Sequence, residues 1–283
     1  MPELPEVETV RRGLAGAVVG RRITAVEVGR PRTVRRTSPQ EVIDGLTGAT
    51  IVAVERRGKY LVGHLDSGDA VMVHLRMSGQ LLLAPAGSPR PPHTHVVVHL
   101  EGRPPEELWF VDPRTFGEVV VFDPDHADTE LPELARLGVD PVADEVDVDD
   151  LRAILRPRRG GLKALLLDQH AIAGIGNIYA DEILHAARLH PDQRSDTLRR
   201  TEIRRLHAAI HDVLGAAIEA RGSTLADRRY VDLMGSGGSY QDAHRVYGRA
   251  GERCRTCDRG VIRRTITNGR STHHCPWCQR ARQ

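Results

Sequence analysis

The first residues of the chain combine two groups that could cooperate in covalent catalysis. Methionine before proline is readily removed, so Pro2 would carry the free α-amino group as a secondary amine. Such a group titrates at about 7.7–8.0, well below lysine, and is partly unprotonated at neutral pH. Its attack on a sugar C1′ would give an iminium, and the acid of the adjacent Glu3 could protonate the leaving group. Pro2 and Glu3 therefore indicate Schiff-base chemistry, with a trimmed helix start as the alternative interpretation.

The segment that follows predicts the element on which these two residues sit. Leu4, Val7, Val10 and Leu14 recur at helical spacing and form one apolar stripe, as in an amphipathic helix. Pro5 suits the first turn, where a missing N–H costs nothing. The stripe explains the helix but leaves Pro2 and Glu3, which precede it, without a structural reason.

The four cysteines of the chain form two Cys-x-x-Cys pairs with seventeen residues between them. This spacing is that of a zinc ribbon, in which each pair sits on a tight turn and aims two thiolates at one tetrahedral ion. Four sulfur ligands leave no open position, so one structural Zn²⁺ is expected. The intervening sequence predicts a β-hairpin that turns at Asn268-Gly269 and presents Arg270 beside the turn. The predicted ligands are Cys254, Cys257, Cys275 and Cys278.

The remaining sequence predicts an α+β protein with several domains. Residues 22–122 contain short β-branched runs separated by turn signals, which favours an antiparallel sandwich or barrel. Residues 151–221 hold four helical patterns, among them "GLKALLLDQHAI" and "NIYADEILHAARL", with Asn177 expected as an N-cap. The predicted domains are 1–122, an acidic linker at 123–150, a helical domain at 151–243 and a zinc ribbon at 244–283.

The charge is unevenly distributed along the chain. Ten arginines and two carboxylates between 244 and 283 give +8, whereas eleven carboxylates and one arginine between 123 and 150 give −10. Such partitioning indicates that the C-terminal end meets a polyanion. No apolar run reaches the roughly 18 residues of a membrane span, and the N-terminus lacks the pattern of a signal peptide. We therefore expect a cytoplasmic protein with no membrane partner.

Several motifs together resemble the formamidopyrimidine-DNA glycosylase family. They stand in the expected order from Pro2 to the last cysteine and include "MPELPEVETVRRGL", "RRGKYL", "HLRMSGQL", "DPRTFG", "LLLDQHAIAGIGNIYADEIL", "VYGRAGERC" and "GRSTHHCPWCQ". The resemblance implies a β-sandwich with a leading helix, a helix–two-turns–helix element at roughly 161–189 and a zinc ribbon. It implies a monomeric, nucleoid-associated enzyme that acts on damaged double-stranded DNA as glycosylase and abasic-site lyase, with zinc as its one cofactor.

The resemblance also assigns roles to individual residues. Pro2 corresponds to the nucleophile, Glu3 to the catalytic acid and Glu6 to a second acidic residue near the site, and Lys59 to a turn lysine that points to the damaged nucleotide. A glycosylase extrudes this nucleotide, and the vacated space must be filled. The residues implied to fill it are Met77, Arg114 and Phe116. Those implied to contact phosphates are His74, Lys163, Asn177 and Arg270.

Two features depart from the common family pattern. Thr115 stands where many relatives carry a second arginine. The sequence of the 223–241 loop, which would cover the extruded base, differs from that expected of the best-known family members. The expected substrates are 8-oxoguanine and formamidopyrimidines, removed through an iminium at Pro2 and β,δ-elimination. The alternatives are an endonuclease VIII-like glycosylase for oxidised pyrimidines and a non-catalytic DNA-binding protein. Leu4 favours the purine branch, and Pro2, Glu3 and Lys59 argue against the non-catalytic protein.

Overall fold

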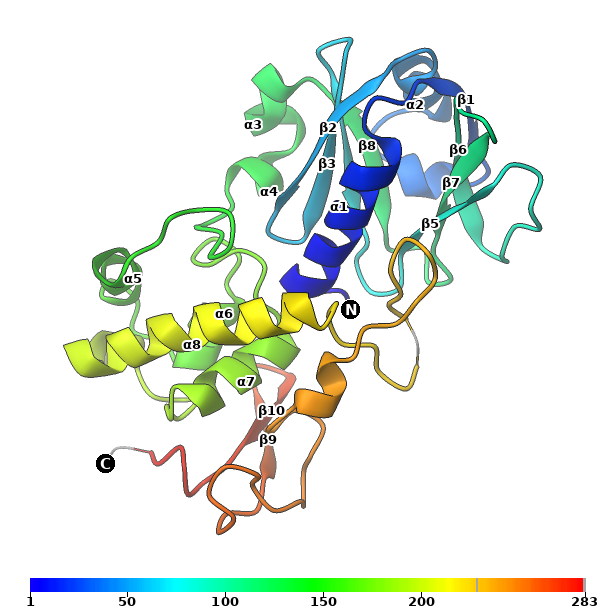
Figure 1. Cartoon of the computed structure of the whole chain (residues 1–283). Coiled ribbons are helices and arrows are strands. Elements are labelled where there is room, and N and C mark those ends of the chain that lie inside the picture. The colour runs from blue at the N-terminus through cyan, green and yellow to red at the C-terminus, as the bar shows by residue number, and fades with distance from the viewer. Residues whose placement is uncertain (228, 282–283) are drawn as a thin grey trace. The chain divides into compact units, whose positions relative to one another are not determined.

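The computed structural model describes residues 1–227 and 229–281, which form two compact units. The first unit contains Met1–Arg136 and Ala220–Ser239, and the second contains Leu137–Glu219 and Tyr240 onward. Each unit is described by itself below, and Figure 1 gives the element labels. Within the described residues, no helix combines the length and apolar character that a membrane span requires.

The first unit is an antiparallel β-sandwich that begins with helix α1 (Leu4–Val18). Its two sheets each have four strands, and all neighbouring strands pair antiparallel, which confirms the predicted sandwich. One sheet has the order β1 (Ile23–Val28), β6 (Thr94–Leu100), β7 (Glu106–Val111) and β5 (Gln80–Pro85). The other has the order β2 (Ile51–Arg57), β3 (Tyr60–Leu65), β4 (Ala70–His74) and β8 (Glu118–Phe122).

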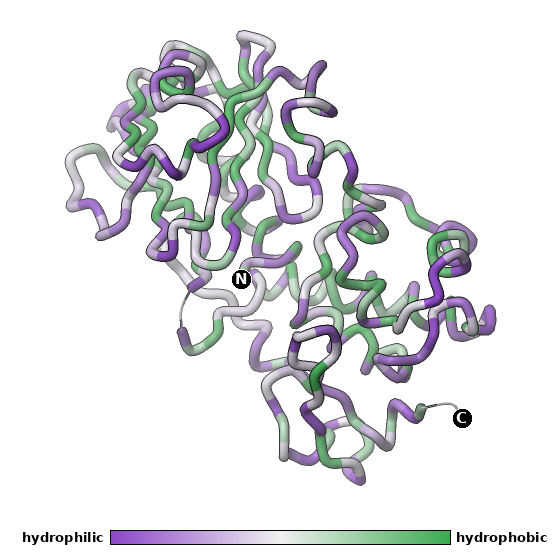
Figure 2. The backbone as a smooth tube through the Cα atoms, turned by 180° about the vertical axis from the view of Figure 1, so that it is seen from behind, coloured by the Kyte–Doolittle hydropathy of each residue, from purple (hydrophilic) through white to green (hydrophobic). Residues whose placement is uncertain are grey.

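The core of this unit joins the apolar stripe of α1 to both sheets. Val7, Val10 and Leu14 are buried in one cluster with strand residues such as Leu61 and Val96. Figure 2 shows the strands as mostly hydrophobic and their connecting turns as mostly hydrophilic. Because α1 is fixed by its buried stripe, the residues at its N-terminal end are held against the sandwich.

One helix of the first unit lies where only β structure was expected. Residues 30–48 contain the 3₁₀ helix η1 (Pro31–Val34) and helix α2 (Pro39–Leu46). Ser38 Oγ accepts the N–H of Glu41, and the Ser38 N–H donates to the Glu41 side chain, which is a complete capping box. The prediction of β structure across 22–122 was therefore wrong here, and the signal "SPQE" could have corrected it.

The predicted domain boundaries also differ from the observed units. The acidic segment at 123–150 is divided between them after Arg136 and carries η2 (Pro124–His126), α3 (Ala127–Glu130) and α4 (Pro132–Ala135). Residues 220–239, expected in the helical domain, instead belong with the sandwich. They are fixed there by backbone hydrogen bonds such as that from Leu83 N to Leu233 O, at 2.9 Å.

The second unit combines helices with a two-stranded ribbon. The four predicted helices are present as α5 (Val148–Leu155), α6 (Leu162–Leu167), α7 (Asn177–Ala186) and α8 (Arg200–Glu219), with 3₁₀ turns η3 (Ser195–Thr197) and η4 (Tyr240–Ala243). The N-cap of α7 is Gly176, so the expectation of Asn177 at that position was off by one residue. Strands β9 (Arg263–Thr267) and β10 (Arg270–His274) pair antiparallel around Asn268-Gly269, as predicted.

Candidate active site and nucleic-acid interface

The two N-terminal glutamates are buried at the start of α1. Glu3 is 2% exposed and Glu6 is 1% exposed, and Pro2 is buried beside them. Glu6 Oε2 accepts the N–H of Glu3 at 2.8 Å, and Glu6 Oε1 accepts the N–H of Ser223 at 2.7 Å. The carboxylate of Glu6 thus ties the main chain next to Pro2 to the 220–239 segment of the same unit.

Gly222 makes this connection possible. Its φ of +77° lies in the left-handed region, and a Cβ at this position would stand 2.7 Å from Glu6 Oε1. A glycine adopts this backbone without the steric cost that other residues incur. The close approach of the Gly222 backbone is therefore part of how Glu6 reaches Ser223.

Lys59 stands on a two-residue turn that a buried ion pair supports. The turn joins β2 to β3 at Gly58 and Lys59, where Gly58 has a positive φ of 57°. The guanidinium of Arg56, whose side chain is 2% exposed, bonds Glu8 Oε2 at 3.1 Å and Gly58 O at 3.0 Å. Glu8 belongs to α1, so one arginine links the helix that begins beside Pro2 to the turn that carries Lys59.

His74 is held as a neutral ring with a defined tautomer. Its Nδ1 accepts the N–H of Arg76 at 3.0 Å, which leaves the proton on Nε2. Burial, together with the charges of Arg76, Lys59 and Arg35, lowers the pKa of His74 to about 3. The ring also packs edge-on against Tyr60, with 4.3 Å between centroids. His74 can therefore serve as a neutral N–H donor at physiological pH, but not as a cation.

Asp112 organises the two loops that carry the proposed space-filling residues. Its Oδ1 accepts Ser78 Oγ–H at 2.5 Å and the Arg114 N–H at 3.2 Å, and its Oδ2 accepts the Gly117 N–H at 2.7 Å. Ser78 follows Met77 directly, so one carboxylate buried to 1% exposure holds both loops. Sequence reasoning missed Asp112, although an aspartate at the start of "DPRTFG" is a signal for an Asx turn.

The Arg114 loop places an arginine and an aromatic ring on the surface. The guanidinium of Arg114 lies 5.1 Å from the centroid of Phe116, which is 43% exposed. Between them, Thr115 has a positive φ of 56°, which is strained for a β-branched residue. The departure from the family pattern at Thr115 therefore coincides with an unfavourable backbone conformation.

In the second unit, Lys163 and Asn177 converge on the ribbon strand β10. Lys163 Nζ and Asn177 Nδ2 donate to the carbonyl of Ser271 at 2.7 and 3.0 Å. Lys163 is fully buried and also forms an ion pair of 2.7 Å with Asp181, which accepts the N–H of His273. The amine of Lys163 is therefore engaged inside the protein, and any phosphate contact would require it to change partners.

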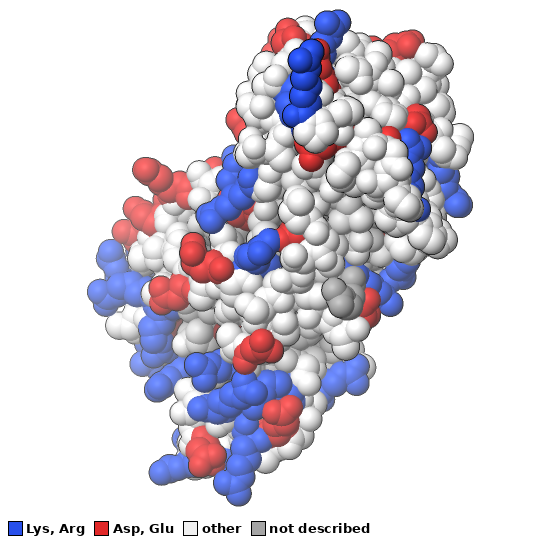
Figure 3. Space-filling view, turned by 45° about the vertical axis from the view of Figure 1, so that its right-hand side comes forward, with Lys and Arg blue, Asp and Glu red and all other residues white. Residues whose placement is uncertain are grey.

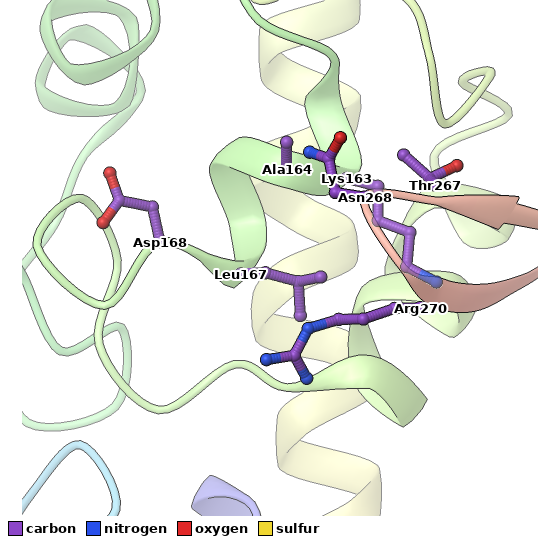
Figure 4. A pocket seen from close by; sticks show the side chains of 7 residues that line it. All are labelled: Lys163, Ala164, Leu167, Asp168, Thr267, Asn268 and Arg270. Atoms are coloured by element: carbon purple, nitrogen blue, oxygen red, sulfur yellow. The ribbon is translucent and has the colours of Figure 1, made fainter.

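A small hollow lies between α6 and the hairpin turn. Its volume is about 170 Å³ and it is lined by Lys163, Ala164, Leu167, Asp168, Thr267, Asn268 and Arg270. Figure 4 shows Arg270 extending from the start of β10 toward Leu167, while Asp168 stands apart from the other labelled side chains. Arg270 is exposed, so its planar guanidinium is available to a ligand such as phosphate.

The four cysteines come together as predicted and form a candidate metal site. Their sulfur atoms all lie within 4.8 Å of one another, and the distances Cys254–Cys278 and Cys257–Cys275 are both 3.8 Å. A tetrahedral ion with metal–sulfur bonds of about 2.3 Å requires sulfur atoms roughly 3.8 Å apart. The cluster therefore has the size of a closed four-thiolate site.

Two buried side chains fasten this region to α7 and the turn after it, and sequence reasoning missed both. Glu182 accepts the backbone N–H groups of Arg245, Val246 and Tyr247 at 2.8–2.9 Å. Burial raises the pKa of Glu182, although these three N–H groups act against the rise. Gln279 is fully buried and spans from Leu189 O to Cys275 N. The ribbon region is thus anchored through hydrogen bonds between these side chains and distant main-chain groups, which no local sequence pattern predicts.

The ribbon region displays most of the arginines that give the chain its basic end. Figure 3 shows Lys and Arg side chains gathered at the ribbon end of the second unit. The exposed ones are Arg245, Arg253, Arg255, Arg259, Arg263, Arg264, Arg270 and Arg280. These features are typical of a polyanion-binding protein, with the basic region surrounding a candidate thiolate metal site.

Comparisons with known proteins specify the family. The model of the formamidopyrimidine-DNA glycosylase N-terminal domain matches residues 1–119, and that of the H2TH domain of the same family matches residues 137–229. The formamidopyrimidine-DNA glycosylase of Salinispora arenicola is 47% identical over 282 residues, covering 99% of this chain and 96% of the relative. That of Carboxydothermus hydrogenoformans is 43% identical over 280 residues, covering 99% and 100%.

Solved structures agree with these matches. Lactococcus lactis Fpg in complex with DNA that contains an abasic site superposes with a TM-score of 0.89 at 36% identity, covering 99% of this chain and 100% of that one. A complex of the same enzyme with DNA that contains Fapy-dG gives a TM-score of 0.88 at the same identity and coverage. The chain therefore belongs to the formamidopyrimidine-DNA glycosylase family. It is accordingly an enzyme, with the DNA glycosylase and abasic-site lyase activities of that family.

Proposed function

We propose that this enzyme removes formamidopyrimidines and 8-oxoguanine from damaged duplex DNA and then cleaves the resulting abasic site. The observation that carries the proposal is the buried Pro2–Glu3 pair, whose main chain Glu6 fixes to the neighbouring 220–239 segment. The Lactococcus lactis relative has been solved with DNA containing Fapy-dG and with DNA containing an abasic site, which are the two substrates that this sequence of reactions requires.

The chemistry begins with the amine of Pro2 once Met1 has been removed. The amine attacks C1′ of the damaged nucleotide, the bond from C1′ to the base nitrogen breaks, and Glu3 supplies the proton for the departing base or the ring oxygen. The product is an iminium between Pro2 and the opened sugar. Loss of a proton from C2′ then expels the 3′ phosphate, and a second elimination expels the 5′ phosphate, which leaves a one-nucleotide gap.

Binding of duplex DNA would draw on both units. Lys59 and the neutral Nε2–H of His74 are donors for phosphates near the damaged nucleotide in the first unit. Arg270 can donate two parallel hydrogen bonds to one phosphate. Lys163 lines the same hollow as Arg270, and Asn177 bonds the carbonyl of the adjacent Ser271, although both residues are far from Arg270 in the sequence. Met77, Arg114 and Phe116 would fill the space that the extruded nucleotide leaves, with Asp112 holding their two loops together.

The metal that fits the four-cysteine cluster is one structural Zn²⁺. The sulfur separations of 3.8 Å match tetrahedral coordination, and a closed Cys₄ site leaves no position for substrate. Zinc would stabilise the fold of the ribbon and so the position of Arg270. The reaction itself needs no other cofactor, and we propose that the enzyme acts as a cytoplasmic monomer bound to nucleoid DNA.

Borohydride trapping on a panel of duplexes tests the function and the nucleophile together. Each duplex carries one lesion: 8-oxoguanine, a formamidopyrimidine, an oxidised pyrimidine or an abasic site. We expect covalent adducts with the two purine lesions and the abasic site, and none behind an uncleaved N-terminal extension. Pro2→Gly should weaken the adducts, because its N-terminus keeps a primary amine but loses the pyrrolidine ring. An adduct that survives the extension would transfer the role of nucleophile to another amine such as Lys59. Preferential cleavage of the oxidised pyrimidine would instead place the enzyme in the endonuclease VIII-like branch.

A further inference from the structure

Two histidines on α8 take no part in the active site or the nucleic-acid interface described above. His207 and His211 are four residues apart, so they share one face of the helix, and their ring centroids are 4.5 Å apart with the ring planes tilted by 55°. Their Nε2 atoms are 3.2 Å apart, and His207 Nε2 lies 2.7 Å from the carbonyl oxygen of Val146. Val146 stands just before α5 in the same unit, and His211 is exposed to solvent.

The two imidazoles converge on one carbonyl oxygen. A neutral imidazole has one ring nitrogen that donates and one that accepts, and a carbonyl oxygen has two lone pairs. The Val146 carbonyl can therefore accept the Nε2–H of His207 and also lies within hydrogen-bonding reach of His211. When the ring protons are displaced, the same three atoms can act as electron-pair donors to one cation.

The spacing also matches what a transition metal requires. Metal–nitrogen bonds of about 2.0–2.1 Å place two imidazole nitrogens on one ion roughly 2.9–3.4 Å apart, from octahedral to tetrahedral geometry. The observed distance of 3.2 Å between the two imidazole nitrogens lies inside this range. The 2.7 Å from His207 Nε2 to the Val146 oxygen is a hydrogen-bond distance, which would lengthen by a few tenths of an ångström when both atoms bind one ion. Two further groups favour a cation here, since the carboxylates of Asp147 and Asp212 interact electrostatically with His207 and His211 respectively.

We propose that His207, His211 and the Val146 carbonyl form a surface site for a divalent transition metal that prefers imidazole, such as Cu²⁺, Ni²⁺ or Zn²⁺. The site is chemically distinct from the cysteine cluster, because it offers nitrogen and oxygen in place of thiolate and leaves positions for water. A bound ion fastens the segment before α5 to α8. The order of affinity is expected to follow the Irving–Williams series, with Cu²⁺ tightest.

The test uses the full-length, untagged protein with zinc already loaded in its ribbon. Ni²⁺ and Cu²⁺ are titrated at pH 7.5 by calorimetry, and the Cu²⁺ complex is examined by electron paramagnetic resonance for nitrogen ligation. We expect one equivalent of each metal beyond the ribbon zinc. His211→Gln should weaken this binding at least tenfold, and His207→Gln should do the same. The matched control is His126→Gln, an exposed histidine of the first unit, which should bind like wild type.

The exposed position of His211 keeps the experiment decisive. Because this side chain is on the surface, His211→Gln should keep the wild-type circular dichroism spectrum and zinc content. A second readout is the thermal midpoint, which should rise on addition of Ni²⁺ for wild type and His126→Gln but not for His211→Gln. Equal affinity in wild type and His211→Gln, or the absence of a nitrogen-ligated Cu²⁺ signal, overturns the proposal.

Discussion

Substitution of Gly222 by alanine tests whether the contact between Glu6 and the 220–239 segment positions the active site. The new Cβ would stand 2.7 Å from Glu6 Oε1 and 2.8 Å from Glu6 Cγ, distances that real Cβ contacts do not reach. The backbone φ of +77° adds a second cost, because alanine is strained in the left-handed region. Either the segment or the carboxylate of Glu6 must move.

Gly235 provides the matched control for this variant. It lies in the same segment with a φ of +78°, but a Cβ there meets no atom within 4 Å. Gly235→Ala should therefore lose only about 1–2 kcal/mol from backbone strain. Gly222→Ala should lose this amount plus about 1–3 kcal/mol for overpacking against Glu6. The difference between the two variants isolates the contact with Glu6, since the effect of alanine on the unfolded chain is common to both.

Two measurements on each variant decide the matter. Urea unfolding gives the stability difference, and single-turnover excision of a formamidopyrimidine from duplex DNA reports on the geometry at Glu3. We expect Gly222→Ala to be less stable than Gly235→Ala and to excise the base more slowly, because displacement of Glu6 releases the Glu3 N–H. Identical stability and identical excision rates in the two variants would refute the reasoning.

Three further predictions concern other parts of the molecule. Asp112→Asn replaces a carboxylate that accepts three hydrogen bonds, so the free energy of unfolding should decrease by about 1–3 kcal/mol and lesion excision from duplex DNA should slow. Ser78→Ala is a milder control in both assays. The pKa of His74 falls to about 3 on folding, so below about pH 6.5 the unfolded chain binds a proton at this residue that the folded protein does not. The free energy of unfolding therefore decreases as the pH falls. His74→Gln should make this decrease smaller in urea titrations from pH 7 to 4. Arg270→Ala should weaken binding to damaged and undamaged DNA alike, with zinc retained, and should reduce the slope of log binding constant against log salt concentration by roughly one. An unchanged slope would exclude a phosphate contact at Arg270. Cys275→Ser should instead release the metal and unfold the hairpin.

The parts of the fold that the sequence predicted correctly are those encoded by local patterns. The apolar stripe of α1, the β-branched runs of the sandwich and the turn at Asn268-Gly269 all depend on residues close together in the chain. The gathering of the four cysteines followed from spacing and ligand chemistry. In each case a short-range rule had no competing long-range contact to overcome.

The parts that could not be predicted depend on partners far away in sequence. The 220–239 segment joins the first unit through contacts such as Ser223 to Glu6, more than two hundred residues apart, which no local pattern encodes. The family resemblance identified Lys163 as a phosphate contact, but its burial against Asp181 follows only from the packing of α6 and α7. Glu182 was missed for the same reason, because the main-chain N–H groups that it accepts are more than sixty residues away. Asp112 differs, since two of its donors are close in the chain and only its bond to Ser78 is long-range.

These buried carboxylates also bear on the assignment of the catalytic acid. Glu3 and Glu6 are both buried near Pro2, so burial does not distinguish them. Glu6 accepts a main-chain N–H on each of its two oxygens, from Glu3 and from Ser223, whereas the side chain of Glu3 accepts the main-chain N–H of Glu6. Both oxygens of Glu6 therefore hold main chain in place, one beside Pro2 and one in the 220–239 segment. This hydrogen bonding suits a positioning residue, so we retain Glu3, the neighbour of Pro2 in the chain, as the proposed acid.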